Sequence, residues 1–176
     1  MTRGMVQVYT GNGKGKTTAA IGQGIRCVGR GLKVYMIQFL KSGETGELKI
    51  CNQLGDCFQI FRFEKPRGFF WKLKEEEKKA LKEEIEKAFA FAEQIVNKKQ
   101  CDVLILDEIM GAMSNQMIKI EKVCALIKSK PAHMELILTG RNVPQEILEL
   151  ADYVSDIQAI KHPIDSGVAA RKGIEY

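Results

Sequence analysis

Hydrophobic and polar residues follow two alternating patterns along the chain. Short apolar runs typical of strands occur at 5–9, 32–40, 57–63, 101–106, 135–139 and 153–160. Apolar residues at helical spacing occupy 16–30, 74–99 and 119–128, and shorter helices are expected near 48–54 and 144–150. The runs at 101–106 and 135–139 are continuous, which is typical of central strands buried on both faces. The alternation predicts one α/β domain over residues 1–176, with a mainly parallel sheet flanked by helices.

A glycine-rich segment, TGNGKGKTT from Thr10 to Thr18, separates the first predicted strand from the first predicted helix. A phosphate-binding loop requires this order of strand, loop and helix. Its glycines allow successive N–H groups to face one concavity, and the helix N-terminus adds partial positive charge. Thr10 replaces the first glycine of the G-x-x-x-x-G-K-[ST] pattern, but Gly11 and Gly13 can supply the turn. We therefore expect a P-loop NTPase-like (RecA-like) fold that binds a nucleoside triphosphate.

Two side chains of this loop have specific expected roles. Lys16 would reach the phosphate oxygens, and the Thr17 hydroxyl would help to hold Mg²⁺. Asp107 and Glu108 end a central strand and predict the opposite side of the same metal site, reached directly or through water. Of these two acids, we favour Glu108 as the nearer ligand.

Two arginines are candidates for contact with phosphate. Arg141 follows the strand at 135–139, so it should reach the same edge of the sheet as the P-loop. An exposed arginine on a capped turn is the alternative for this residue. Arg26, by its position on the first helix, is expected at the surface or in packing.

Composition narrows the class of protein. Charged residues make up 28% and apolar residues 45% of the chain, and the net charge is +5, as in ordinary globular domains. Basic residues form no run with interleaved aromatics, so we expect no nucleic-acid partner. No stretch is long enough for a membrane span or a secretory signal. Five cysteines without a C-x-x-C pair favour reduced thiols in the cytoplasm. His133 and His162 lack metal-ligand spacing and are expected to be structural or surface residues.

Three consecutive aromatic residues, Phe69, Phe70 and Trp71, follow Pro66 and Gly68 in a predicted loop. Apolar bulk in a loop usually has a partner. The residues alone leave two interpretations open. One is a small core cluster beneath the loop, and the other is a lid or stacking platform for a large flat ligand.

Several motifs together resemble the ATP:corrinoid adenosyltransferases of the P-loop type. They lie at 11–20, 34–41, 68–71, 103–108, 139–142, 161–168 and 173–176. The modified P-loop and a tail ending in Gly-Ile-acid-Tyr are specific to that group. The motifs extend from one end of the chain to the other.

The resemblance implies a particular reaction. Such enzymes transfer the 5′-deoxyadenosyl group of ATP to the cobalt of a reduced corrinoid, cobalamin or cobyrinic acid a,c-diamide, and release triphosphate. Cobalt(I) is itself a strong nucleophile and needs no protein base. ATP is implied to lie reversed in the P-loop, with its C5′ exposed. The implied nucleotide-binding residues are Gly11, Asn12, Gly13, Lys14, Gly15, Lys16, Thr17, Thr18, Arg26 and Arg141, with Mg²⁺ held by Thr17, Glu108 and Asp107.

The resemblance also gives the aromatic loop a role. Phe69 and Trp71 match positions that displace the lower axial ligand of the corrinoid, which makes cobalt(II) easier to reduce. A homodimer in the cytoplasm and an electron donor such as a flavoprotein are implied as well. Related proteins often carry an amino-terminal extension that covers the partner's active site. Only Met1 to Gly4 precede the first strand here, so we expect this cover to be absent or replaced.

Two other functions fit the residues without the resemblance. A P-loop phosphotransferase or ATPase would use the same loop, acids and Arg141, and would yield ADP or orthophosphate. A nucleotide-gated binding module would bind its ligand through the aromatic loop without consuming ATP.

Overall fold

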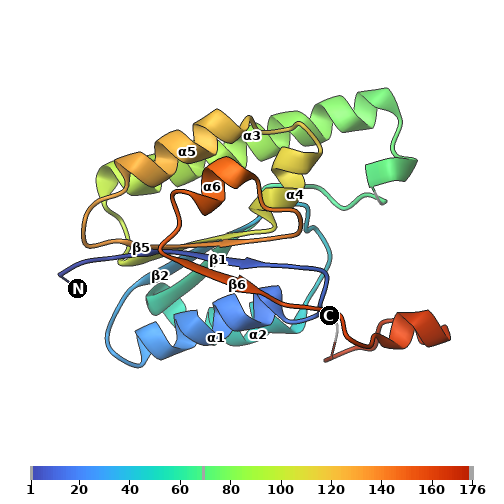
Figure 1. The fold of residues 1–176 in the computed structure, drawn as a ribbon, viewed down its shortest axis with the longest axis horizontal. Helices are drawn as coiled ribbons and strands as arrows, with labels where there is room; N and C mark the ends of the chain where they lie inside the picture. The colour runs from blue at the N-terminus through green and yellow to red at the C-terminus, as the bar shows by residue number, and fades with distance from the viewer. Residues whose placement is uncertain (1, 69, 175–176) are drawn as a thin grey trace.

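The computed structural model describes residues 2–68 and 70–174, except for the side chain of Trp71. Its centre is a sheet of six strands, all parallel, in the order β3-β2-β4-β5-β1-β6 (Figure 1). The strands are β1 (Val6–Thr10), β2 (Val34–Gln38), β3 (Phe58–Phe61), β4 (Val103–Asp107), β5 (Glu135–Thr139) and β6 (Tyr153–Asp156). The α/β expectation is confirmed, and the parallel arrangement holds for every strand pair.

Helices cover both faces of the sheet. On one face lie α1 (Lys16–Val28) and α2 (Gly46–Gln53), and on the other lie α3 (Glu75–Lys98), α4 (Ile109–Ser114), α5 (Ile120–Ser129) and α6 (Gln145–Leu148) (Figure 1). Three short 3₁₀ helices complete the described elements: η1 (Gly55–Cys57), η2 (Phe70–Lys72) and η3 (Pro163–Ser166). Because both faces are covered, every residue of β2, β4 and β5 is buried.

The two faces of the sheet have separate apolar cores. The larger core joins α3, α4 and α5 to the sheet and includes Ile85, Phe89 and Leu126. The smaller core lies beneath α1 and α2, where Ala20 and Cys51 pack with Phe58. In α1, Gly24 lies against the Phe58 ring, since a Cβ there would be 2.7 Å from it. The close contact brings the helix that starts at the P-loop firmly onto the sheet.

Buried polar side chains collect where the strands end. Gln38 is paired in register with Asp107 across β2 and β4, and Tyr9 is paired with Thr139 across β1 and β5. Gln38, Asp107 and Thr139 are all nearly inaccessible to solvent. A parallel sheet brings the carboxyl ends of its strands to one edge, and ligands of such sheets bind outside that edge.

The structure differs from the sequence prediction in several elements. α4 was not predicted, because it is short and its residues Ile109 to Met113 have no polar face that would reveal a helical period. β2 and β3 are both shorter than expected, since β2 spans only Val34–Gln38 and β3 ends at Phe61. β6 ends at Asp156 rather than at residue 160, because the next residues turn over the P-loop. There, the Ile157 N–H donates to the Thr10 carbonyl at 2.9 Å, and the Gly13 N–H donates to the Ile157 carbonyl at 2.7 Å.

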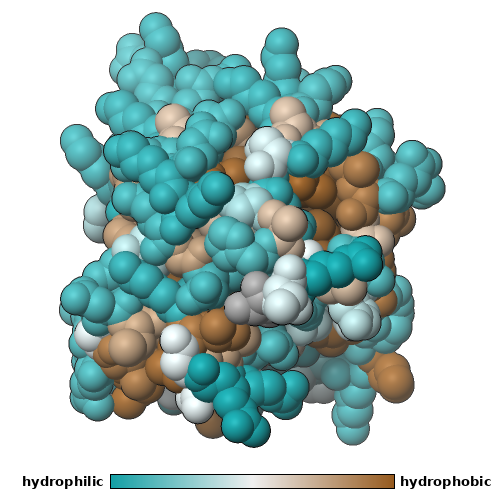
Figure 2. Space-filling view, turned by 90° about the vertical axis from the view of Figure 1, so that its left-hand side faces the viewer, coloured by the Kyte–Doolittle hydropathy of each residue, from teal (hydrophilic) through white to brown (hydrophobic). Residues whose placement is uncertain are grey.

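Figure 2 shows the surface at the amino ends of the strands, on the side of the molecule away from the P-loop. This surface is mainly hydrophilic, with scattered apolar side chains. Within the described residues, no helix has the length and apolar character needed to cross a membrane.

Candidate active site

The P-loop forms the floor of a cavity of about 470 Å³, which is within the usual size range of small-molecule sites, roughly 300–1,000 Å³. Residues 12–18 all line it. Gly11 and Gly15 have φ values of 98° and 120°, a region that side-chain-bearing residues rarely adopt. These two glycines therefore allow the loop to curl around the N-terminus of α1. Gly11 does not line the cavity itself, but its carbonyl accepts a hydrogen bond from Lys16.

Lys16 is folded back onto the loop. Its Nζ donates to the carbonyls of Gly11 and Gly13, at 2.8 Å each. Burial lowers the pKa of Lys16, and the positive charge of Arg141 lowers it further. A phosphate in the cavity would offer this ammonium a better acceptor than the two neutral carbonyls.

Asp107 is the centre of a hydrogen-bond network at the end of β4. Its Oδ1 accepts hydrogen bonds from Thr17 Oγ1 at 2.8 Å and Thr139 Oγ1 at 2.7 Å. Its Oδ2 accepts one from Gln38 Nε2 at 3.0 Å. The network ties the first turn of α1 to strands β2, β4 and β5.

Glu108 follows Asp107 in a left-handed conformation, with φ at 61°. Its N–H donates to Thr139 Oγ1 at 2.9 Å, which supports this uncommon backbone conformation. The side chain lines the cavity, where burial raises its pKa and the negative charge of Asp107 raises it further. Gly111 makes room for the carboxylate, because a Cβ there would lie 2.9 Å from Glu108 Oε1.

Together these side chains offer hard oxygen donors of the kind that Mg²⁺ prefers. Thr17 and Glu108 line the cavity, and Thr17 Oγ1 is hydrogen-bonded to the Asp107 carboxylate behind it. The described residues contain no group of three or more His, Cys, Asp or Glu side chains arranged to bind a metal. One hydroxyl and two carboxylates fit an ion that keeps several water or phosphate ligands, as Mg²⁺ does.

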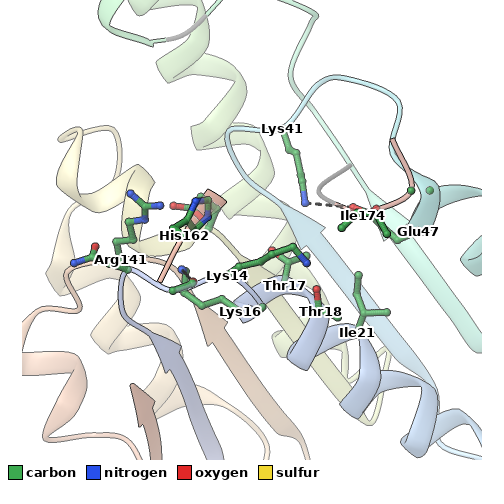
Figure 3. Close-up of a pocket in the computed structure, with 16 residues that line it drawn as sticks. Lys14, Lys16, Thr17, Thr18, Ile21, Lys41, Glu47, Arg141, His162 and Ile174 are labelled. Carbon is green, nitrogen blue, oxygen red and sulfur yellow. Dashed lines mark hydrogen bonds and ion pairs between the residues drawn. The ribbon is translucent and has the colours of Figure 1, made fainter. Parts of the chain in front are cut away.

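Arg141 also lines the cavity, just after β5. The preceding Gly140 has φ at 138°, and a Cβ there would lie 2.6 Å from the Cβ of Met110. Close packing of this turn against α4 thus fixes the backbone position of Arg141. In Figure 3, Arg141 and His162 lie on one side of the cavity, with Lys14 and Lys16 beneath them.

Some residues that the sequence suggested are placed elsewhere. Arg26 is exposed in the last turn of α1 and does not line the cavity. This position agrees with a surface or packing role rather than with the nucleotide contact that the resemblance implies. Phe69 and the side chain of Trp71 lie outside the described part of the structure. The intervening Phe70 packs against the larger core.

The cavity also contains residues that sequence reasoning did not select. Lys41 follows β2 and Glu47 begins α2, and their side chains form an ion pair at 3.2 Å across the upper wall (Figure 3). His162 and Ile174 from the tail complete the wall, although His162 was expected to be a structural or surface residue. Lys41 could have been noticed because it immediately follows the apolar run at 32–40, from which a strand was expected.

A second cavity of about 680 Å³ adjoins the first. It lies between the turn after β2, the aromatic loop and the start of α4, and Phe70 and Leu81 supply apolar surface. Thr17, Lys41 and Glu108 line both cavities. Two ligands bound in these cavities would therefore meet at these three side chains.

Comparisons with known proteins agree with this arrangement. Residues 2–176 match the family model described as ATP:corrinoid adenosyltransferase BtuR/CobO/CobP. The chain is 36% identical over 177 residues to the corrinoid adenosyltransferase of Escherichia coli K12, covering 99% of this chain and 86% of that protein. It is 35% identical over 175 residues to corrinoid adenosyltransferase CobA of Salmonella typhimurium, with the same coverage.

A solved structure shows the same fold at low sequence identity. The flagellar accessory protein FlaH of Methanocaldococcus jannaschii is 15% identical, with a TM-score of 0.58 over 89% of this chain and 72% of FlaH. That likeness concerns the fold alone. The family match over almost the whole sequence is of a different kind, and it places this chain in the ATP:corrinoid adenosyltransferase family.

Proposed function

We propose that the protein transfers the 5′-deoxyadenosyl group of ATP to cobalt(I) of a reduced corrinoid and releases triphosphate, in cobalamin biosynthesis or salvage. The main observation that supports this function is that a P-loop cavity and a larger, partly apolar cavity meet at three shared side chains. A reaction between a nucleotide and a second large substrate needs this arrangement. Family membership makes that second substrate a corrinoid, either cobalamin or cobyrinic acid a,c-diamide.

The proposed role of each residue follows from the charge of its side chain. Loop amides, Lys14, Lys16 and Arg141 would bind the triphosphate, with ATP in the reversed orientation that exposes C5′. Thr17, Asp107 and Glu108 would hold Mg²⁺, which supplies further charge neutralisation for the phosphates. Because cobalt(I) is a strong nucleophile, the protein's part is positioning and electrostatics rather than proton abstraction.

Phe69 and Trp71 are proposed to displace the lower axial ligand of the corrinoid and so to assist reduction of cobalt(II). Replacing either by alanine should reduce turnover from cob(II)alamin far more than turnover from chemically reduced cob(I)alamin. The comparison uses one enzyme preparation and two starting oxidation states, so a general folding defect would lower both rates. If a variant lost turnover equally from cob(II)alamin and from cob(I)alamin, the proposed role of Phe69 and Trp71 in displacing the axial ligand would be wrong.

The cellular setting is proposed from the family. A homodimer in the cytoplasm, supplied with electrons by a donor such as a flavoprotein, suits a reaction that consumes cobalt(I). Neither nucleic acid nor a membrane is needed as a partner.

The test is an anaerobic assay with chemically reduced cobalamin, Mg²⁺ and ATP. We expect a light-sensitive alkylcobalamin in the visible spectrum and triphosphate as the phosphate product. The competing phosphotransferase or ATPase function would give ADP or orthophosphate without alkylation, and that result would overturn the proposal. The family match does not favour this competitor.

A further inference from the structure

The wall shared by the two cavities contains one cationic side chain among the described residues. Thr17 and Glu108 contribute oxygen donors there, and Lys41 contributes an ammonium group. A group that passes from a ligand in one cavity to a ligand in the other must cross at this wall. The three shared side chains therefore lie nearest to the bond that breaks.

The backbone aims Lys41 at this wall. The preceding Leu40 has φ at 56°, which is uncommon for a residue with a side chain. Its N–H donates to Glu64 Oε1 at 2.6 Å, and this bond supports the strained turn. A strained backbone conformation of this kind is a reason to suspect a functional constraint on the residue that follows.

Two acids fix the ammonium group. Lys41 Nζ lies 3.2 Å from Glu47 Oε1 and 3.5 Å from Asp107 Oδ2. Its side chain remains 29% exposed, so the group still faces the cavities. Lys41 is thus held at the wall rather than extended into solvent.

Arg62 holds the segment that carries Lys41 and Glu47. Its guanidinium donates to Gln38 Oε1 and Thr45 Oγ1, at 2.7 Å each, and to the carbonyl of Gly43. It also lies 3.6 Å from Glu47 Oε1. The 38–47 segment is therefore held at four points by a residue that follows the edge strand β3, and Lys41 is presented by a supported backbone.

From this geometry we infer that Lys41 is a catalytic residue whose ammonium group contacts the triphosphate where it separates from C5′. The inference rests on the proposed adenosyl transfer. In that step cobalt(I) donates its electron pair to C5′ to form the Co–C bond. The C5′–O bond breaks, and its electron pair remains on the triphosphate oxygen. No proton moves, so the negative charge on the leaving oxygen must be stabilised by cations already in place.

The test is Lys41→Met, which removes the charge and keeps most of the aliphatic stem. Starting from chemically reduced cobalamin, we expect the single-turnover rate to fall by about 10²–10³-fold, as when other preorganised groups that stabilise transition-state charge are removed. The dissociation constant of Mg·ATP should change much less than the rate, which also shows that the variant is folded. Lys49→Met is the matched control, because Lys49 is exposed on α2 and lines neither cavity, and it should react like the wild type.

A second variant separates charge from structure. In Lys41→Ala, added ethylammonium should restore part of the lost rate, whereas a residue needed only for packing would not be rescued. An unchanged rate in Lys41→Met, or a loss confined to Mg·ATP affinity, would overturn the inference. Formation of adenosylcobalamin and triphosphate by the wild type upholds the proposed function whatever the variants do. Failure of the wild type would remove the function and this inference together.

Discussion

At the scale of single residues, Asp107 is the side chain on which most others at the site depend. It accepts hydrogen bonds from Thr17, Thr139 and Gln38 while almost fully buried. In Asp107→Asn, an amide NH₂ replaces one acceptor oxygen and faces donors. We expect the free energy of unfolding to fall by about 1–3 kcal/mol, because buried polar groups lose their partners.

Urea unfolding measures this loss, and isothermal titration with Mg·ATP should show weaker binding as well. Glu83→Gln provides the control, since Glu83 is exposed on α3 and its substitution should leave the urea midpoint unchanged. An Asp107→Asn midpoint equal to that of the wild type would contradict the central role of Asp107.

Glu64 predicts a pH dependence of stability. Burial raises the pKa of this carboxyl above its ordinary value of 4.5. The folded protein therefore holds the proton to higher pH than the unfolded chain does. The stability that Glu64 contributes is fully present below about 4.5 and is lost as pH rises through the raised pKa.

Glu64→Gln removes that pH dependence, since glutamine keeps an acceptor for the Leu40 N–H and never ionises. The variant should have a higher Tm than the wild type at neutral pH, and the difference should narrow as pH falls toward 4.5. Thermal unfolding of both proteins without ligand, followed by circular dichroism over that range, gives the answer. A difference in Tm that stays constant with pH would mean that Glu64 ionisation does not matter.

The sequence predicted those site residues that belong to local motifs. The P-loop order identified Lys16 and Thr17, and the ends of buried strands identified Asp107, Glu108 and Arg141. Lys16, Thr17, Glu108 and Arg141 line one cavity, and Asp107 is hydrogen-bonded to Thr17 beside it. Lys41 offered only the weak signal of following an apolar run. Glu47 offered none, because its position depends on an ion pair with Arg62, which follows β3. No local spacing contains that contact.

At the scale of elements, the P-loop and the segment after β6 are packed as one unit. A Cβ on Gly13 would lie 2.6 Å from the Ile157 carbonyl oxygen and 2.7 Å from that of Gln158. Gly13→Ala should therefore push the two segments apart, weaken Mg·ATP binding and lower the Tm. Thermal unfolding with and without Mg·ATP reports both effects.

Gly22→Ala is a matched control in the neighbouring helix. Gly22 lies within α1, and a Cβ there would meet no atom within 4 Å. Alanine should stabilise the helix by roughly 0.5–1 kcal/mol, because it loses less backbone freedom on folding. If Gly13→Ala behaved like Gly22→Ala, the contact between the P-loop and the segment after β6 would contribute nothing to stability.

The spacing of hydrophobic residues predicted most helices and strands, because it reflects which side of each element is buried. β5 was predicted with its observed limits, and α3 and α5 within two residues of theirs. α4 lacked a polar face to reveal its period, and the end of β6 is set by the turn over the P-loop rather than by its own residues. Both exceptions lie beside the site, where tertiary contacts outweigh local pattern.

At the scale of the whole molecule, the last part of the chain contributes to the site without contributing to the described core. No residue of the 161–174 segment is buried, yet His162, Gly173 and Ile174 line the P-loop cavity. In Figure 1 this tail extends past the carboxyl edge of the sheet, on the side where the P-loop lies. Binding and stability should therefore be separable here, unlike at Asp107 or Gly13.

Removing residues 161–176 tests this separation. Because the core residues keep their contacts, we expect the truncated protein to unfold at nearly the same temperature as the full chain in the absence of ligand. Mg·ATP should bind at least about tenfold more weakly, a loss of roughly 1.4 kcal/mol, since one wall of its cavity is gone. Titration calorimetry and thermal unfolding of the two proteins decide the matter. A truncated protein that binds Mg·ATP as tightly as the full chain would show that the tail only lies beside the nucleotide site, whereas a large fall in Tm would show that it stabilises the fold.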